Sequence, residues 1–245
     1  MDYSVYNMTI KDWAITAFKS LGTTAIIAYL FYDSMLLLVV FPVVFMYFIR
    51  ACRLEGVQRQ KDKLTGEFMD ALKTLSSNLL AGYSVENAWK DAENEMRLLY
   101  GNDSLMLSEI TEMNRQIGMN QTFESVLAEF ASRTGIEDIE NFADIFSFAK
   151  RSGGKFVDII EATTYRMWSK YDTNRQIDVA VSAKRLEQKT MNYIPIILLA
   201  FLKVASQDYM SVLYGNAAGI LFMTACLGAY GISIKLAQKV LRIQI

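Results

Sequence analysis

Hydrophobic residues concentrate at the two ends of the chain, whereas charged residues fill its middle. At the first end, residues 21–49 (LGTTAIIAYLFYDSMLLLVVFPVVFMYFI) contain a single charge, Asp33. This run is too long for one membrane-spanning helix of about 20 residues and slightly short for two. Together with the apolar residues before it, the run predicts two spans, over about 13–31 and 35–49. A tight turn at 32–34 joins them and places Asp33 in water.

The other end repeats this plan. Residues 191–206 (MNYIPIILLAFLKVAS) are apolar except for Lys203, and residues 217–234 (AAGILFMTACLGAYGISI) form another strong apolar run. Residues 207–216 (QDYMSVLYGN) form a polar and aromatic connector between them. The C-terminal end therefore predicts a second membrane hairpin.

The middle of the chain has the pattern of packed helices. It has no proline between about 54 and 190, and its apolar residues recur every three or four positions, which is the spacing of a buried helix face. The predicted faces and segments are Phe68, Ala71, Leu72, Leu75 and Leu79, then Val85, Ala88, Trp89, Ala92, Met96 and Leu99, then Leu105–Met119, Phe123–Ser132, Ile136–Lys150 and a helix from near Phe156. The predicted fold class is all-α, a bundle of about six helices flanked by two transmembrane hairpins.

Glycines fall between these segments, where a left-handed residue commonly ends a helix. Ser84 and Thr122 follow two of the breaks and are good N-cap residues. The separating glycines are Gly82, Gly101, Gly118, Gly135, Gly153 and Gly154. The helix–glycine–helix pattern around Gly82 recurs loosely around Gly153 and Gly154, so two helical hairpins of similar design bracket the predicted bundle.

The last helix of the middle segment is unusually long. Between Lys155 and Asn192 the sequence has neither glycine nor proline, which corresponds to about 57 Å of straight helix. The helix runs into the span that begins near Met191. It either couples movement of the bundle to the membrane or is a plain connector, and the sequence leaves both readings open.

Basic residues give the predicted orientation, because cytoplasmic segments next to membrane spans are enriched in lysine and arginine. They are Arg50, Arg53, Arg59, Lys61 and Lys63 after the first hairpin, Lys184, Arg185 and Lys189 before the second, and Lys235, Lys239 and Arg242 after the last span. The short connectors at 32–34 and 207–216 have none. The chain is thus expected to cross the cytoplasmic membrane about four times, with both termini inside. The predicted domains are a membrane hairpin over 1–53, a cytoplasmic helical domain over 54–190, and a second hairpin with a short tail over 191–245.

Composition narrows the chemistry. Residues 53–189 hold 18 basic and 22 acidic residues, and a mildly acidic middle disfavours a nucleic-acid partner. The chain has no histidine and only two cysteines, Cys52 and Cys226, which removes the commonest general base and most zinc ligand sets. The cysteines are expected to be small buried hydrophobic residues. We expect no cofactor, no metal and no enzymatic activity.

Two motifs in the middle segment resemble a known family. They are LLAGYSVENAWKDA, with Gly82, Ser84 and Ala88, and, about 70 residues later, AKRSGGKFVDIIEATTYRM, with Gly153 and Gly154. In this order they are similar to the motifs of the type II secretion system F domain, over about residues 64–190. The flanking hairpins resemble the layout of the tight-adherence (Flp) pilus members, which have one such domain where secretion platforms usually have two.

The resemblance implies a platform protein of the inner membrane. Such a protein couples a cytoplasmic secretion ATPase to the insertion of pilin-like subunits into a growing filament. It implies two further partners, the lipid bilayer and either a paralogous platform protein or a second copy of the chain. From the residues themselves, Gly82, Ser84 and Ala88 have structural roles: a helix end, a cap and a close helix contact.

Several charged residues are candidates for contact with a partner. Glu93 and Glu95 lie in an acidic stretch near a helix start, where either the helix dipole and solvation or docking to a motor explains them. Arg151 and Lys155 flank Gly153 and Gly154 in RSGGK, which resembles part of a phosphate loop. That loop requires a second glycine five residues earlier, a Ser or Thr after the lysine and a preceding strand. The sequence has neither that glycine nor that Ser or Thr, and it predicts no strand before the motif. Nucleotide binding is therefore disfavoured.

A transporter or permease subunit is the alternative function. In that case Lys19, Asp33, Lys203 and Asp208 form a polar path inside the membrane, because intramembrane charges usually mark transport routes. In the platform interpretation Lys19 lies near a span end, where its ammonium reaches the interface, and the other charges lie at hairpin tips or reach the interface in the same way. A membrane sensor is a third class, but the sequence shows no output domain.

Overall fold

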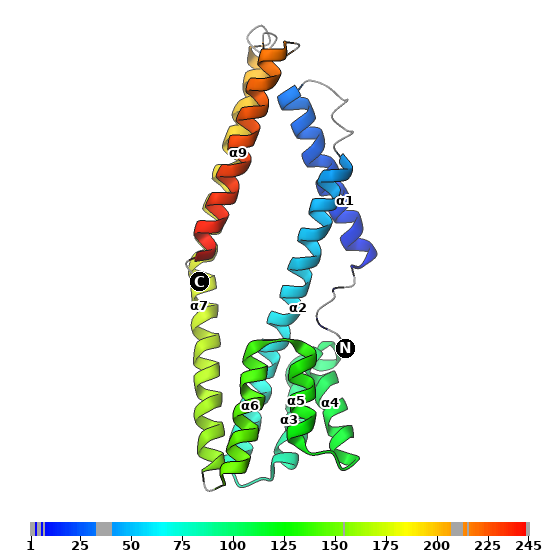
Figure 1. Cartoon of the computed structure of the whole chain (residues 1–245), viewed down its shortest axis with the longest axis vertical. Helices are drawn as coiled ribbons and strands as arrows, with labels where there is room; N and C mark the ends of the chain where they lie inside the picture. The colour runs from blue at the N-terminus through cyan, green and yellow to red at the C-terminus, as the bar shows by residue number, and fades with distance from the viewer. Residues whose placement is uncertain are drawn as a thin grey trace. The chain divides into compact units, whose positions relative to one another are not determined.

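The computed structural model is helical throughout the residues that it describes, with no strand among them. These residues are Tyr3, Tyr6, 8–32, 41–153, 155–206, 213, 214 and 216–243. Figure 1 shows the helices along the chain. The prediction of an all-α fold is therefore confirmed for this part of the chain.

The chain forms two compact units. One, called the core unit, contains Met1–Asn7 and Arg53–Thr173, and the other, called the apolar unit, contains Met8–Cys52 and Asn174–Ile245. Helices α2 (Phe41–Leu80) and α7 (Phe156–Ala205) contribute residues to both units. The predicted boundaries between the membrane hairpins and the cytoplasmic domain, at 53/54 and 190/191, stay predictions.

The core unit is built on the C-terminal part of α2, the N-terminal part of α7 and four helices between them. These are α3 (Val85–Tyr100), α4 (Leu105–Gly118), α5 (Phe123–Thr134) and α6 (Glu137–Ser152), with a 3₁₀ turn at Gly101–Asp103. Their apolar faces share one hydrophobic core. Its largest fully buried side chains are Trp89, Phe68, Phe123, Phe130, Phe142 and Phe146.

The breaks between these helices lie where the sequence placed them, because each has a local cause. Ser84 accepts a hydrogen bond from the backbone N–H of Asn87, and Thr122 accepts one from Ser125. Each cap satisfies an N–H that has no partner within its helix. Both caps and the segment boundaries next to them are confirmed.

Two expectations about single residues are wrong. Gly118 is still helical, and the positive φ after α4 falls on Asn120, at 65°. Asparagine tolerates this conformation better than other non-glycine residues. Leu99 is exposed rather than buried, because Ala92 and Met96 already occupy the core-facing side of α3 and Leu99 projects beyond its edge.

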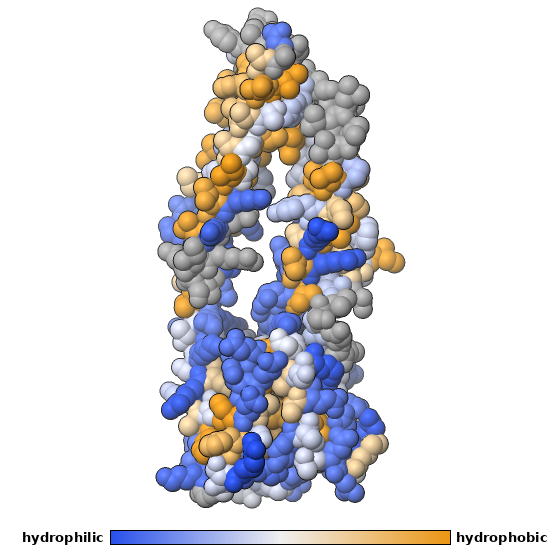
Figure 2. All heavy atoms as spheres, in the orientation of Figure 1, coloured by the Kyte–Doolittle hydropathy of each residue, from blue (hydrophilic) through white to orange (hydrophobic). Residues whose placement is uncertain are grey.

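The apolar unit contains α1 (Ile10–Ile27), a π-helical segment η1 (Ala28–Tyr32), the first part of α2, the rest of α7 and α9 (Ala217–Ile243). Two of its helical segments are long and apolar enough to cross a membrane, among the described residues: Ile10–Tyr32 and Ala218–Ala237. Hydrophobic residues cover much of α9 (Figure 2). These two segments correspond to two of the four predicted spans, and the other two spans stay predictions.

Details of the predicted hairpins differ. The described part of the predicted span at 35–49, residues 41–49, belongs to the same helix as Phe68. Helix α2 runs unbroken from Phe41, and its only proline, Pro42, lies in its first turn, where proline is tolerated. Lys19 is in the interior of α1, not near a span end. The turn at 32–34 lies largely outside the described residues, as does most of 207–216.

The two cysteines are less buried than expected, whereas the long helix α7 agrees with expectation. Cys226 is exposed and Cys52 is partly buried, so neither is the fully buried residue that was expected. Helix α7 continues from Phe156 through Asn192 to Ala205, with Pro195 inside it. The predicted unbroken helix is confirmed, and it continues into the apolar run that begins near Met191, as expected.

Candidate partner-binding surface

Three helix–helix turns gather at one end of the core unit. Lys73 Nζ of α2 lies 4.2 Å from the ring centroid of Trp168 in α7, and the hydroxyl of Tyr171 lies against Gly66. Gly66 is about four helical turns before the end of α2, and Tyr171 is about four turns after the start of α7. The α2–α3 and α6–α7 turns are therefore at the same end (Figure 1).

A series of aromatic ring contacts links the α4–α5 turn to the α2–α3 and α6–α7 turns. Trp89 contacts Phe123 at 5.2 Å between centroids, Phe123 contacts Phe146 at 4.8 Å, and Phe146 contacts Phe156 at 5.2 Å. These rings come from α3, α5, α6 and α7, and Phe123 and Phe156 are the first residues of their helices. One aromatic layer thus lies directly beneath the three turns.

The α2–α3 turn is closed by its own backbone. Gly82 has φ of 87°, and the N–H of Tyr83 donates to the carbonyl of Asn78 at 3.0 Å. This six-residue bond at a left-handed glycine is the Schellman arrangement that ends many helices. Ala88 is fully buried one turn into α3, so the small side chain allows close packing as the sequence predicted. The structural roles predicted for Gly82, Ser84 and Ala88 fit this geometry.

The α6–α7 turn has a different geometry. Gly153 has φ of 76° and ψ of −107°, which only glycine adopts readily. The N–H of Phe156 donates to the Gly153 carbonyl at 3.1 Å and so begins α7. Gly154 lies outside the described residues. Arg151 and Lys155 are both exposed on either side of this turn, and Arg151 Nε donates to the Ser147 carbonyl at 3.2 Å.

We call this end of the core unit the turn surface. It carries Arg151 and Lys155 together with large apolar side chains that are each more than half exposed: Leu80, Tyr83, Met119 and Phe148. The visible surface of the core unit is otherwise mostly hydrophilic, with hydrophobic residues between the polar ones (Figure 2). Mixed apolar and cationic side chains on a rigid layer are typical of a protein-binding surface.

The two acidic candidates lie in different environments although they are two residues apart. Glu93 is mostly buried between α3 and α4, where its carboxylate accepts from Asn114 Nδ2 at 2.7 Å, from Thr111 Oγ1 at 3.0 Å and from Arg97 at 3.1 Å. Glu95 is exposed on the outer side of α3. The expectation of a solvated acidic face is wrong for Glu93, which joins two helices.

Substitution of these two glutamates should therefore have unequal effects. Glu93→Lys places a cation among hydrogen-bond donors and is expected to lower the free energy of unfolding by about 2–3 kcal/mol, because three donors lose their acceptor. Glu95→Lys should change it by less than about 0.5 kcal/mol. Urea unfolding of the two full-length variants in the same detergent measures the difference. Equal stabilities would contradict the buried role of Glu93.

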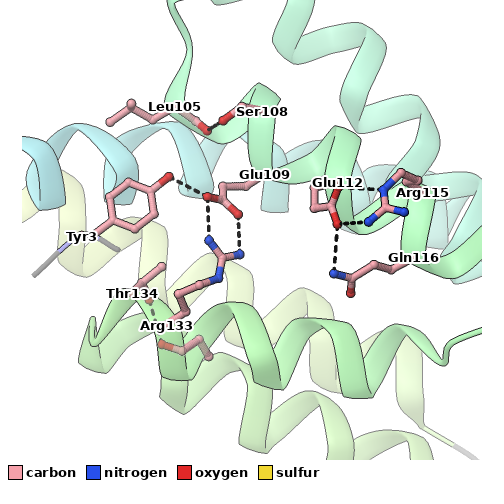
Figure 3. Close-up of polar contacts among 10 residues, drawn as sticks. Tyr3, Leu105, Ser108, Glu109, Glu112, Arg115, Gln116, Arg133 and Thr134 are labelled. Atoms are coloured by element: carbon pink, nitrogen blue, oxygen red, sulfur yellow. Dashed lines mark hydrogen bonds and ion pairs between the residues drawn. The ribbon is translucent and has the colours of Figure 1, made fainter. Parts of the chain in front are cut away.

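A buried polar network lies away from the turn surface, and the sequence analysis missed it. Glu109 of α4 is only 3% exposed, and its two oxygens accept from Arg133 of α5 at 2.9 and 2.5 Å. The Tyr3 hydroxyl donates to the same carboxylate at 2.8 Å (Figure 3). Neither spacing nor periodicity reveals such a network, since Tyr3 is 106 residues from Glu109.

Protonation equilibria follow from these contacts. Burial opposes ionisation of Glu109, but hydrogen bonds from Arg133 and Tyr3 outweigh it, so the pKa of Glu109 is lowered. Burial and the Glu109 hydrogen bond both raise the pKa of Tyr3.

A second buried carboxylate, Glu67, accepts from the Met106 N–H at 2.8 Å and from Ser104 Oγ at 3.0 Å. Glu67 thereby fixes the start of α4.

Substitution of Arg133 should lower the free energy of unfolding by an amount that depends on pH. A carboxyl group with a lowered folded-state pKa stabilises the fold above its unfolded pKa, near 4.5, and loses this contribution as pH falls through the folded value. Arg133→Met leaves the buried carboxylate without its cation, so Glu109 should instead favour protonation. We expect the variant to lose about 3 kcal/mol of unfolding free energy at pH 7, and the deficit to shrink as pH falls toward 4.5.

Arg115 provides the matched control for this measurement. It pairs with Glu112 at 2.5 Å on the surface of α4 (Figure 3), where an ion pair contributes little. Arg115→Met should leave the free energy of unfolding nearly unchanged at every pH, because solvent screens this exposed pair. Chemical unfolding of both variants between pH 4.5 and pH 8 gives the comparison. A deficit for Arg133→Met that is independent of pH would show that Glu109 is not the group responsible.

Polar contacts also join helices within the apolar unit. Lys203 of α7 donates to the Tyr29 carbonyl in η1, and its Nζ lies 3.6 Å from the Tyr29 ring centroid. Tyr214 donates to the Leu30 carbonyl at 2.5 Å. Backbone carbonyls near a helix end need such external donors. The contacts give Lys203 a structural partner, whereas Asp33 and Asp208 of the predicted polar path lie outside the described residues.

Comparison with known proteins gives no match, whether to a protein-family model, to a curated protein or to a solved structure. The residues that the structure describes form an all-α fold, and two of their helices are long and apolar enough to span a membrane. Among the described residues, no group of three or more histidine, cysteine, aspartate or glutamate side chains is placed to hold a metal ion.

Proposed function

We propose that the chain is a membrane platform protein of the type II secretion system F class, serving assembly of a tight-adherence pilus or a related filament. It acts by binding and by transmitting movement, and it is not an enzyme. Its core unit faces the cytoplasm and binds a secretion ATPase, and its apolar segments cross the inner membrane about four times and meet pilin-like subunits.

The arrangement of the two glycine turns is the observation that best supports this proposal. Gly82 and Gly153 each end a helix with positive φ, at the same end of the core unit. The helices that meet these turns, α2 and α7, are the two that also contribute to the apolar unit. A force applied at the turn surface acts on both helices, and a continuous helix is stiff enough to transmit it.

The turn surface is the proposed docking site for the motor. Arg151 and Lys155 supply positive charge beside exposed apolar side chains such as Phe148 and Tyr83. Charged groups at the edge of an interface select the partner, and apolar groups contribute most of the binding free energy. Glu95 lies on a separate exposed face of α3, next to Leu98 and Leu99, and is a second candidate contact.

Co-purification with the secretion ATPase of the same organism tests the function. The full-length chain in detergent should retain the ATPase, and Arg151→Gln with Lys155→Gln should weaken the association about tenfold. Arg166→Gln is the matched control, because Arg166 is an exposed cation of α7 about three helical turns from Phe156. Equal binding by all variants would remove the turn surface from the proposal. No association with the unaltered chain would contradict the platform function itself.

Reporter fusions test the proposed membrane arrangement separately. A reporter joined after Ile245 and a reporter placed in the core unit are both expected on the cytoplasmic side, because basic residues flank each apolar segment on that side. A periplasmic signal from either position would contradict the four-span arrangement with internal termini.

A further inference from the structure

Helices α7 and α9 lie antiparallel within the apolar unit. The hydroxyl of Tyr230 in α9 donates to the Asn192 carbonyl in α7, and Met223 of α9 shares a hydrophobic cluster with Leu199 of α7. Met223 precedes Tyr230 by seven residues and Leu199 follows Asn192 by seven, so the two helices run in opposite directions (Figure 1). The end of α9 therefore lies beside the part of α7 that precedes Asn192.

Cations gather at this end of the helix pair. By the same spacing, Lys235 and Lys239 of α9 are level with residues of α7 between about 183 and 187. Two α7 cations at this level have carboxylate partners, Lys184 with Glu187 at 3.0 Å and Arg185 with Asp178 at 3.1 Å. Lys189 of α7, Lys235 and Lys239 are exposed and form no ion pair with another residue of the part of the chain that the structure describes. Three positive charges at this end thus have no counter-charge within the described chain.

An apolar stripe runs past these lysines on the outer side of α9. Ile232, Leu236 and Val240 are each more than half exposed, and their spacing of four residues places them on one face of the helix. Ile232 follows Tyr230 by two residues, a rotation of about 200°, so this face is turned away from α7. The part of α9 before Lys235 carries no charge. Apolar surface and cations therefore meet at this level of the helix.

We propose that this end of the α7–α9 pair binds the headgroups of anionic phospholipids, with Lys189, Lys235 and Lys239 as the charged contacts. The ammonium groups attract phosphate oxygens, and the apolar stripe contacts the upper part of the acyl chains, along which the apolar stems of the lysines extend. A dissolved phosphate would account for the cations but not for the stripe, which extends to Val240, beyond both lysines of α9. The site rests on the proposed location of the apolar segments in a membrane.

Native mass spectrometry of the full-length chain in detergent tests the site with two lipids, anionic phosphatidylglycerol and zwitterionic phosphatidylcholine. The unaltered chain should bind phosphatidylglycerol at least about tenfold more tightly, because each lysine near an anionic surface contributes about fivefold in affinity. Lys235→Gln with Lys239→Gln should remove most of this preference. Equal affinity of the unaltered chain for the two lipids, or an undiminished preference in the variant, would overturn the site.

Two matched variants separate the position of the charges from other effects. Lys90→Gln with Arg166→Gln removes two exposed cations of the core unit and should leave the preference for phosphatidylglycerol unchanged. Lys235→Arg with Lys239→Arg retains both charges and should preserve the preference. An equal loss in the core-unit variant would show that net charge alone sets the preference. A loss in the arginine variant would show that attraction between charges is not its cause, and either result contradicts the proposal.

Competition with glycerol phosphate distinguishes a lipid from a dissolved anion. This molecule has the charged part of the headgroup without acyl chains, so it should displace little phosphatidylglycerol even in large excess. Complete displacement would make a soluble phosphate the ligand and overturn the lipid site.

Membrane fractionation of cells separates failure of this site from failure of the proposed function. Recovery of the unaltered chain in the soluble fraction would contradict both. A chain that stays in the membrane but has no preference for phosphatidylglycerol would contradict the headgroup site alone.

Discussion

Replacing Gly153 by valine is expected to abolish filament assembly while leaving the chain in the membrane. Gly153 has φ of 76° and ψ of −107°, a conformation that costs a residue with a branched side chain about 1–3 kcal/mol. The core unit can tolerate this cost by adjusting the turn, but the adjustment changes the direction in which α7 leaves α6. Because α7 continues to Ala205 without a break, we expect the error to reach its apolar part.

Gly118 supplies the control for this substitution. It is the last residue of α4, it has no positive φ, and a Cβ added there meets nothing within 4 Å. Gly118→Val should assemble filaments normally and fold with nearly unaltered stability. The measurements are filament assembly in cells and membrane fractionation of each variant. Normal assembly by Gly153→Val would show that the turn at Gly153 is a passive connector.

Truncation of Phe146 to alanine is expected to cause the largest loss of stability. Phe146 is fully buried and contacts Phe123, Phe142 and Phe156 with centroid distances of 4.8, 6.1 and 5.2 Å. Removing its ring opens a cavity among aromatic side chains of α5, α7 and α6 itself. We expect the free energy of unfolding to fall by about 3–5 kcal/mol, which is a large part of the stability of a typical domain.

Phe148 is the matched control on the same helix. It lies two residues away, is 63% exposed, and should cost less than about 0.5 kcal/mol when changed to alanine. Phe148→Ala should instead weaken association with the motor, because Phe148 belongs to the turn surface. Thermal unfolding in detergent and co-purification separate the two effects. Similar stability losses for both variants would contradict the aromatic layer as the centre of the core.

Local sequence signals determined where the helices of the core unit begin and end. Ser84 and Thr122 cap helices through bonds to residues three positions ahead, and Gly82 and Gly153 take the backbone angles that other residues avoid. The apolar spacing of Ala88, Trp89, Ala92 and Met96 correctly predicted a buried face. These features depend only on residues a few positions away along the chain, so the sequence alone is enough to predict them.

Only the tertiary structure decided which polar residues work together. Glu93 and Glu95 have the same chemistry and nearly the same position in sequence, yet one joins α3 to α4 and the other faces outward. The contact of Tyr3 with Glu109 and the gathering of three turns on one surface likewise join distant segments. Periodicity identifies the inner face of a helix but not the helix that packs against it. Partners for buried charges are therefore determined by packing across the fold, and no local pattern encodes them.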